Sequence, residues 1–133
     1  MKKILFLIVA IVLAVSCNDD ESSNSNRTVT GQWSLAEILS DPGDGSGTFQ
    51  PVVSTKTITF YSNGEVSSNG SLCTMGQTTT ASNGTYSETD HSITVSCDGA
   101  TLALPYTISD NRLIVSYFCI EGCKEKYVQM MAD

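Results

Sequence analysis

Apolar and polar residues alternate with a period of two along most of the chain after residue 28, which is typical of half-buried β-strands and not of helices. The alternating segments are rich in Val, Ile, Thr, Tyr and Phe, which favour strands. The predicted strands lie at residues 33–38, 57–61, 65–67, 85–88, 92–95, 102–108, 112–118 and 126–130. No stretch after residue 27 offers three clean helical turns, so the pattern predicts an all-β domain of about eight or nine short strands.

The turns between these segments indicate hairpins. Asn63-Gly64 is a strong hairpin signal, and Asp90 and the Asp110-Asn111 pair mark two further turns. Successive antiparallel hairpins that hide their edges close most simply into an up-and-down barrel, with a β-sandwich as the alternative. We expect Trp33, Leu35 and Glu37 to share one face of the first strand. Pro105 inside a strand suggests an edge or a bulge.

Four cysteines fall in or beside the remaining connections, which the alternation of hairpins places together at the opposite end of the barrel. They are Cys73, Cys97, Cys119 and Cys123. In an exported protein they predict two disulfides, and we favour Cys73 with Cys97 and Cys119 with Cys123 among the three possible connectivities. A metal site using the last two cysteines and the Cys73-Thr74-Met75 stretch is the weaker alternative, because the spacing is not a tight Cys-x-x-Cys pair.

The N-terminus predicts export. Lys2 and Lys3 precede an uncharged apolar run from residue 4 to residue 15, and Ser16 stands before Cys17. This is the order of a signal peptide over residues 1–16. The run is shorter than the roughly 20 residues of a membrane-spanning helix, so a permanent span is the weaker interpretation.

The segment Leu13-Ala14-Val15-Ser16-Cys17 resembles the lipobox of bacterial lipoproteins. The resemblance implies that Cys17 is acylated, palmitate being one such acyl chain, and becomes the first residue of a membrane-anchored protein. Residues 17–28 are acidic and polar and predict a flexible tether. The acidic run Asp19-Asp20-Glu21 resembles signals that route some lipoproteins to the cell surface of the outer membrane. A merely solvating linker on a periplasm-facing protein is the alternative.

Charge excludes some partners. Removing 16 residues from 133 leaves 117, with five basic and fourteen acidic side chains because Lys2 and Lys3 are lost, and a net charge near −9. Nucleic acid requires a basic surface, and anionic lipid would repel this one. Any membrane attachment must therefore come from the lipid on Cys17. The length of residues 29–133 suits one small domain.

Several motifs together resemble the small lipocalin-like domains of exported bacterial lipoproteins. They are the Gly31-Gln32-Trp33 start, the hairpin at residues 60–64, the Tyr106-Thr107-Ile108 strand and the final Cys-x-x-x-Cys with Tyr127. The resemblance covers nearly all of residues 29–131. It implies that Trp33 closes one end of the barrel, with Arg112 as a candidate partner for the ring. The domain is shorter than an ordinary lipocalin.

Little in the chain indicates catalysis. His91 is the only histidine and lies beside Asp90 in a predicted solvated turn, and the sequence contains no hydrolase, zinc-protease or phosphate-loop motif. Asp41 and Asp44 among glycines hint at calcium, but the alternating ligand order of an EF-hand is missing. We therefore expect no enzyme activity, no cofactor and no metal.

Two functions of different classes remain. The first is a binding module for a small apolar or amphipathic ligand, with residues 40–47 as a lid over inward side chains. The predicted ligand-lining residues are Ile58, Phe60, Tyr86, Ile93 and Tyr106. The second is an accessory subunit that binds a larger envelope complex through an exposed apolar surface. A hydrolase inhibitor is a third option, and it would need residues 67–84 to protrude.

Overall fold

The computed structural model describes residues 28–131 as an all-β domain. The predicted signal peptide, Cys17 and all of the predicted tether except Thr28 lie outside the described residues. The nine strands are β1 (Gly31–Ser40), β2 (Gln50–Pro51), β3 (Thr57–Phe60), β4 (Glu65–Ser68), β5 (Ser82–Ser87), β6 (Ser92–Cys97), β7 (Ala100–Ser109), β8 (Arg112–Tyr117) and β9 (Cys123–Gln129).

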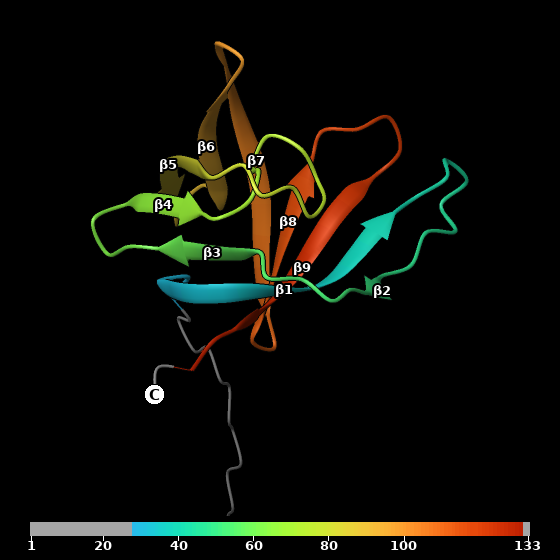
Figure 1. The fold of residues 1–133 in the computed structure, drawn as a ribbon, viewed down its shortest axis with the longest axis horizontal. Coiled ribbons are helices and arrows are strands. Elements are labelled where there is room, and N and C mark those ends of the chain that lie inside the picture. The colour runs from blue at the N-terminus through green and yellow to red at the C-terminus, as the bar shows by residue number, and fades with distance from the viewer. Residues whose placement is uncertain (1–27, 132–133) are drawn as a thin grey trace, which may run out of the picture.

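The strands form a closed antiparallel barrel (Figure 1). From β3 to β9 each strand pairs with the next, and β1 closes the ring by pairing with both β3 and β9. The short strand β2 lies outside the ring and pairs only with Glu37 and Ile38 of β1. The predicted up-and-down barrel is therefore correct, and the sandwich alternative is wrong.

The connections gather at two opposite ends. The start of β1, the end of β9 and the turns after β3, β5 and β7 lie at one end, which we call the entry end because the described chain begins there with Thr28. The end of β1 and the connections after β4, β6 and β8 lie at the other end. This end contains all four paired cysteines, and we call it the cysteine end.

Strand alternation builds the core. In each strand every second side chain points inward, as the burial pattern of β8 shows with Leu113, Val115 and Tyr117 buried between more exposed neighbours. Burying apolar surface in this way contributes about 25 cal/mol per Å² to folding. The fully buried large side chains are Val29, Trp33, Ile58, Phe60, Val66, Leu72, Ile93, Leu104, Leu113, Val115, Glu125 and Tyr127.

The first strand departs from the predicted face. Its register with β9 shifts between Leu35 and Glu37, so Ala36 forms a β-bulge that changes which side chains point inward. Glu37 therefore lies outside, where its carboxylate accepts a hydrogen bond from Lys126 Nζ at 2.7 Å. Ile38 packs against the core instead. The expectation that Glu37 shares a face with Trp33 and Leu35 is wrong.

Pro105 lies where β7 changes partner. Residues 100–105 of β7 pair with β6, and the pairing with β8 begins at Tyr106. Pro105 is exposed and opposes Ser92. A residue without an amide N–H is tolerated at such a position because no strand pairs with β7 there on the β8 side.

Candidate functional site at the cysteine end of the barrel

The entry end of the barrel is closed by apolar side chains. Trp33 and Val29 are each 1% exposed, and the Trp33 indole Nε1 donates a hydrogen bond to the Val29 carbonyl at 2.8 Å. Thr28 and Thr30 bind the rim through Glu88 and Tyr86. Arg112 is exposed, because Leu113 takes the inward position next to it in β8. The cation–π contacts within residues 28–131 involve Lys56 and Lys126, so a pairing of Arg112 with the Trp33 ring stays a prediction.

The five predicted ligand-lining residues pack on one another inside the barrel. Ile58, Phe60, Ile93 and Tyr106 are buried, and the Phe60 ring meets the Tyr86 ring edge-on with centroids 5.0 Å apart. The Tyr86 hydroxyl leaves the core and donates to the Tyr61 carbonyl. The cavity beside Arg112 and Val128 and the one beside Lys56 and residues 77–79 are not lined by any of these five residues. These five residues belong to the packed core, and their binding of a ligand stays a prediction.

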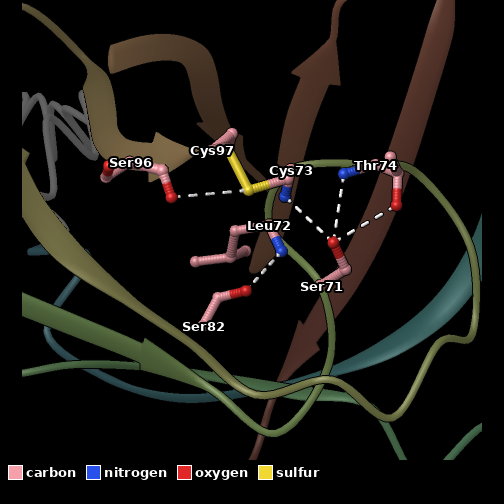
Figure 2. Close-up of a disulfide and its surroundings, with 7 residues drawn as sticks. All are labelled: Ser71, Leu72, Cys73, Thr74, Ser82, Ser96 and Cys97. Carbon is pink, nitrogen blue, oxygen red and sulfur yellow. Dashed lines mark hydrogen bonds between the residues drawn. A yellow bond between two sulfur atoms is a disulfide. The ribbon is translucent and has the colours of Figure 1, made fainter. Parts of the chain in front are cut away.

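The cysteine end is closed by a segment that folds inward. Residues 69–81, which connect β4 to β5, place Leu72 in the core with no exposed surface, and we call this segment the plug. Cys73 next to it is joined to Cys97 at the end of β6 (Figure 2). The Leu72 amide donates to Ser82 Oγ, and Ser71 Oγ accepts from the amides of Cys73 and Thr74. Residues 70–72 are therefore turned into the barrel, whereas residues 77–81 are exposed, and the inhibitor hypothesis stays a prediction.

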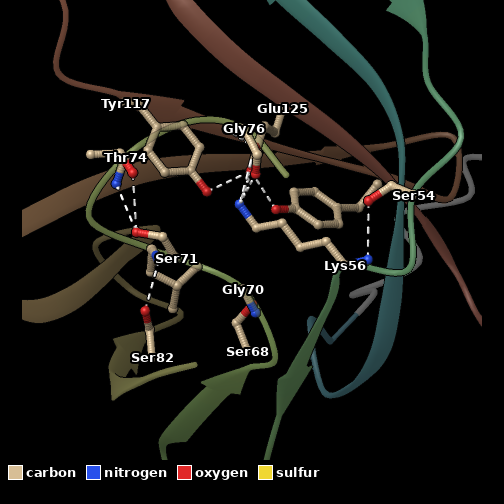
Figure 3. Close-up of polar contacts among 12 residues, drawn as sticks. Ser54, Lys56, Ser68, Gly70, Ser71, Thr74, Gly76, Ser82, Tyr117 and Glu125 are labelled. Carbon is tan, nitrogen blue, oxygen red and sulfur yellow. Dashed lines mark hydrogen bonds and ion pairs between the residues drawn. The ribbon is translucent and has the colours of Figure 1, made fainter. Parts of the chain in front are cut away.

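A buried ion pair lies beneath the plug. Lys56, just before β3, and Glu125 of β9 are 3% and 0% exposed, and Lys56 Nζ lies 3.0 Å from Oε1 and 2.9 Å from Oε2 of Glu125. The Tyr117 hydroxyl donates to Oε2 at 2.6 Å, and the Tyr127 hydroxyl donates to the same oxygen. Figure 3 shows the side chains of Lys56, Tyr117 and Glu125 meeting beside Gly76 of the plug. The ion pair is fully hydrogen-bonded, which is what a charge needs in a core.

Burial controls the protonation of the groups around this pair. Desolvation lowers the pKa of Lys56, and the Glu125 charge opposes that shift. Desolvation also raises the pKa of the Tyr117 and Tyr127 hydroxyls, and the neighbouring Glu125 carboxylate adds to both shifts. Both tyrosines therefore stay protonated donors, and the arrangement holds atoms in place and does not present a reactive group to solvent.

Sequence reasoning missed Lys56 and Glu125, although a signal was present. Lys56 has the same strand parity as Ile58 and Phe60, and Glu125 has the same parity as Tyr127. Strict alternation places both charged residues on the inward face. The sequence could not predict that Lys56 and Glu125 pair with each other, because they are 69 positions apart and no local spacing connects them.

The connection between β8 and β9 projects outward. Phe118 is 68% exposed and Ile120 is 98% exposed, and a disulfide between Cys119 and Cys123 closes the connection into a short ring. We call residues 118–123 the apolar loop. Both disulfides join the pairs that the sequence favoured. The cysteines are thereby occupied, so the metal alternative is wrong for them.

The predicted lid packs beside the apolar loop. The Asp41 amide donates to the Gly122 carbonyl at 3.2 Å. The Asp41 carboxylate accepts from the amides of Gly43, Gly45 and Gly47, which lowers its pKa. These bonds use the carboxylate to shape the turn, and the bond from Asp41 to Gly122 places residues 40–47 as a supporting turn beside the apolar loop. A role of these residues as a lid stays a prediction. Among residues 28–131 no group of three or more His, Cys, Asp or Glu side chains is placed to hold a metal ion.

The remaining candidate residues lie far from this end. Asp90 and His91 occupy the exposed turn between β5 and β6, where Asp90 accepts from Ser87 Oγ and His91 adopts a left-handed φ of 49°. The turn positions them as predicted, at the entry end.

Neither a search of protein-family models nor a search of curated proteins found a match to this chain. Within residues 28–131, no helix has the length and apolar character needed to cross a membrane.

Proposed function

We propose that the protein is a lipid-anchored, lipocalin-like lipoprotein of the cell envelope that acts without catalysis, as an interaction subunit. The observation that supports this role is the exposure of Phe118 and Ile120 in a loop closed by a disulfide. Ile120 lies inside the disulfide-closed ring, and Phe118 stands between the end of β8 and that ring. Backbone held in this way loses little conformational freedom when a partner covers the two side chains. Such anchors supply much of the binding energy in protein interfaces.

The interior of the barrel favours an interaction subunit over a ligand-binding module. Trp33 and Val29 close one end, Leu72 closes the other, and the inward side chains between them are buried in one cluster. An eight-stranded barrel is just wide enough for its own side chains or for one small ligand. The buried cluster supports the first of these two arrangements.

The chemistry of the loop indicates its partner. The exposed Glu121 carboxylate lies against Gly43, in the supporting turn that also contains Asp41 and Asp44. Hydrogen bonds from Ser46 lower the pKa of Asp44, so it stays ionised. The complementary surface is an apolar pocket with a basic rim on an envelope protein, because opposite charges around a buried centre favour encounter and register.

The first described residue and the apolar loop lie at opposite ends of the barrel. The described chain begins at Thr28 at the entry end, whereas residues 118–123 lie at the cysteine end. A lipid on Cys17 would attach the barrel to the membrane through its entry end and leave the apolar loop, at the other end, accessible to a partner. We propose the outer membrane as the location, facing the cell surface, with a periplasm-facing protein as the alternative.

Site-specific photo-crosslinking in intact cells tests the interaction. A photoreactive amino acid at position 120 is expected to yield one dominant protein adduct, and the same group at Thr107, exposed on the barrel wall, is expected to yield none. A synthetic disulfide-closed peptide of residues 118–124 should compete for the adduct, and its linear Cys-to-Ser form should compete less. Equal labelling from both positions would contradict the proposal.

Mass spectrometry of the protein purified from its native membrane tests the anchor. The expected mass corresponds to a chain beginning at an acylated Cys17 with both disulfides intact. An unmodified Cys17, or a chain that still carries residues 1–16, would contradict the lipoprotein assignment. The crosslinking result does not depend on the outcome of this experiment.

A further inference from the structure

The plug, residues 69–81, is fixed differently from the closure of the entry end. At the entry end Trp33 and Val29 are apolar and continuous with β1. The plug buries only one large apolar side chain completely, Leu72, and Met75 packs against the core while partly exposed. Its other contacts are hydrogen bonds and one disulfide. A segment with few apolar contacts opens at lower free energy than the core around it.

We propose that the plug is released when the Cys73–Cys97 disulfide is reduced, and that the seat beneath it binds a peptide segment carrying a leucine-like side chain. Leu72 is adjacent to Cys73, so it cannot leave the core while Cys73 is joined to β6. The reductant in this proposal is a dithiol of the cell envelope, which attacks one sulfur of the Cys73–Cys97 disulfide. Two electrons and two protons pass from the dithiol to this disulfide. Both cysteines end as thiols, and the dithiol ends as a disulfide.

The contacts of the plug define what the seat recognises. The Gly76 amide donates to Glu125 Oε1 at 2.8 Å, and the Gly76 carbonyl accepts from Lys56 Nζ at 3.1 Å. One residue therefore offers a donor to the carboxylate and an acceptor to the ammonium group. When the plug leaves, Lys56 and Glu125 still hold each other, and each has one free hydrogen-bonding position.

The seat thus has two parts at a fixed separation. The first is the position that Leu72 fills among buried apolar side chains, and the second is the Lys56–Glu125 pair that binds a backbone N–H and C=O. An extended peptide satisfies both, because backbone groups and side chains alternate along it. A small cavity of about 80 Å³ between Lys56 and residues 77–79 shows that the rim of the plug is not tightly packed against the wall.

Hydrogen exchange of the Cys119→Ser/Cys123→Ser variant tests the release, because only the Cys73–Cys97 disulfide remains to be reduced. Dithiothreitol should accelerate exchange of the amides of residues 72–76 by at least roughly tenfold, while those of β1 and β9 stay protected. Plug amides that exchange only together with β9, in reduced and oxidised protein alike, would overturn the proposal.

Peptide binding tests the seat. In the Leu72→Asp/Cys73→Ser/Cys97→Ser variant the plug cannot return to the core, which removes its intramolecular competition. A peptide of residues 69–81 with Cys73→Ser should bind this variant saturably, one per barrel, and the same peptide with Leu72→Asp should not. Equal binding of both peptides, or binding of neither to a variant whose β9 amides remain protected, would overturn the seat. If that variant fails to fold, the same two peptides are tested for binding to the reduced Cys119→Ser/Cys123→Ser variant, and the same outcomes apply. Neither experiment depends on the apolar loop.

Discussion

Glu125 is the residue on which the buried polar contacts converge, since Lys56, Gly76, Tyr117 and Tyr127 all donate to its carboxylate. We expect Glu125→Ala to lower the free energy of unfolding by about 3–5 kcal/mol, because it leaves the Lys56 charge buried without a partner. Urea unfolding followed by the fluorescence of Trp33, the single tryptophan, measures this.

The double variant Lys56→Met/Glu125→Leu is the matched control. It removes both charges and replaces them with apolar side chains, so it should be more stable than Glu125→Ala. If the double variant loses as much stability as the two single variants added together, the ion pair is not the unit that we describe.

A single residue also determines how closely β5 and β6 approach. Gly84 of β5 opposes Val95, and a Cβ at this position would lie 2.2 Å from the Thr94 carbonyl oxygen, which belongs to the backbone. We expect Gly84→Ala to cost about 1–3 kcal/mol, as overpacking does. The exposed neighbour Asn83 is the control, and Asn83→Ala should change the urea midpoint little. Equal losses at both positions would exclude this steric cause.

At the scale of elements, the strands and hairpins were largely predictable because their signals are local. Turn residues such as Asn63 and Asp110 and period-two alternation identify a strand within a few positions of the chain. The same alternation brought the cysteines to one end. The bulge at Ala36 was not predictable, because it depends on the register with β9, far away in the sequence.

The two disulfides are expected to contribute unequally. Cys73–Cys97 spans 24 positions and Cys119–Cys123 spans 4. Chain-entropy estimates give about 3.5 kcal/mol for the first loop and about 2 kcal/mol for the second. The double Cys-to-Ser variants, compared by urea unfolding without reductant, measure the difference. A larger loss from the 119–123 variant would show that the supporting turn at Asp41 depends on the loop for stability.

At the scale of the whole molecule, the plug could not be predicted from sequence. Residues 69–81 are rich in Ser, Thr and Gly and contain few apolar residues, which indicates an exposed loop. Leu72 and Gly76 enter the barrel because the disulfide and the distant Lys56–Glu125 pair hold them there. The apolar loop was equally hidden, because a short sequence between two cysteines does not show which of its side chains face solvent.

Stability of the whole barrel should fall at alkaline pH. Burial raises the pKa of Tyr106 to about 12 and raises those of Tyr117 and Tyr127, so the folded state favours three neutral hydroxyls. A raised pKa gives stability that is complete below the ordinary tyrosine value of about 10 and is lost as pH rises towards the folded value.

Lys56 acts in the opposite direction, because its lowered pKa makes folding more favourable as pH approaches 10.5. Because three groups act in one direction and one group opposes them, we expect the effect of the tyrosines to dominate. The urea midpoint should therefore be lower at about pH 11 than at about pH 8. Ionisation of these hydroxyls, measured by tyrosinate absorbance, should coincide with unfolding. Tyr106→Phe removes one of the three ionisations and should reduce the difference between the two midpoints. A midpoint that rises between those pH values would mean that the Lys56 contribution dominates and that the tyrosines ionise without leaving the core.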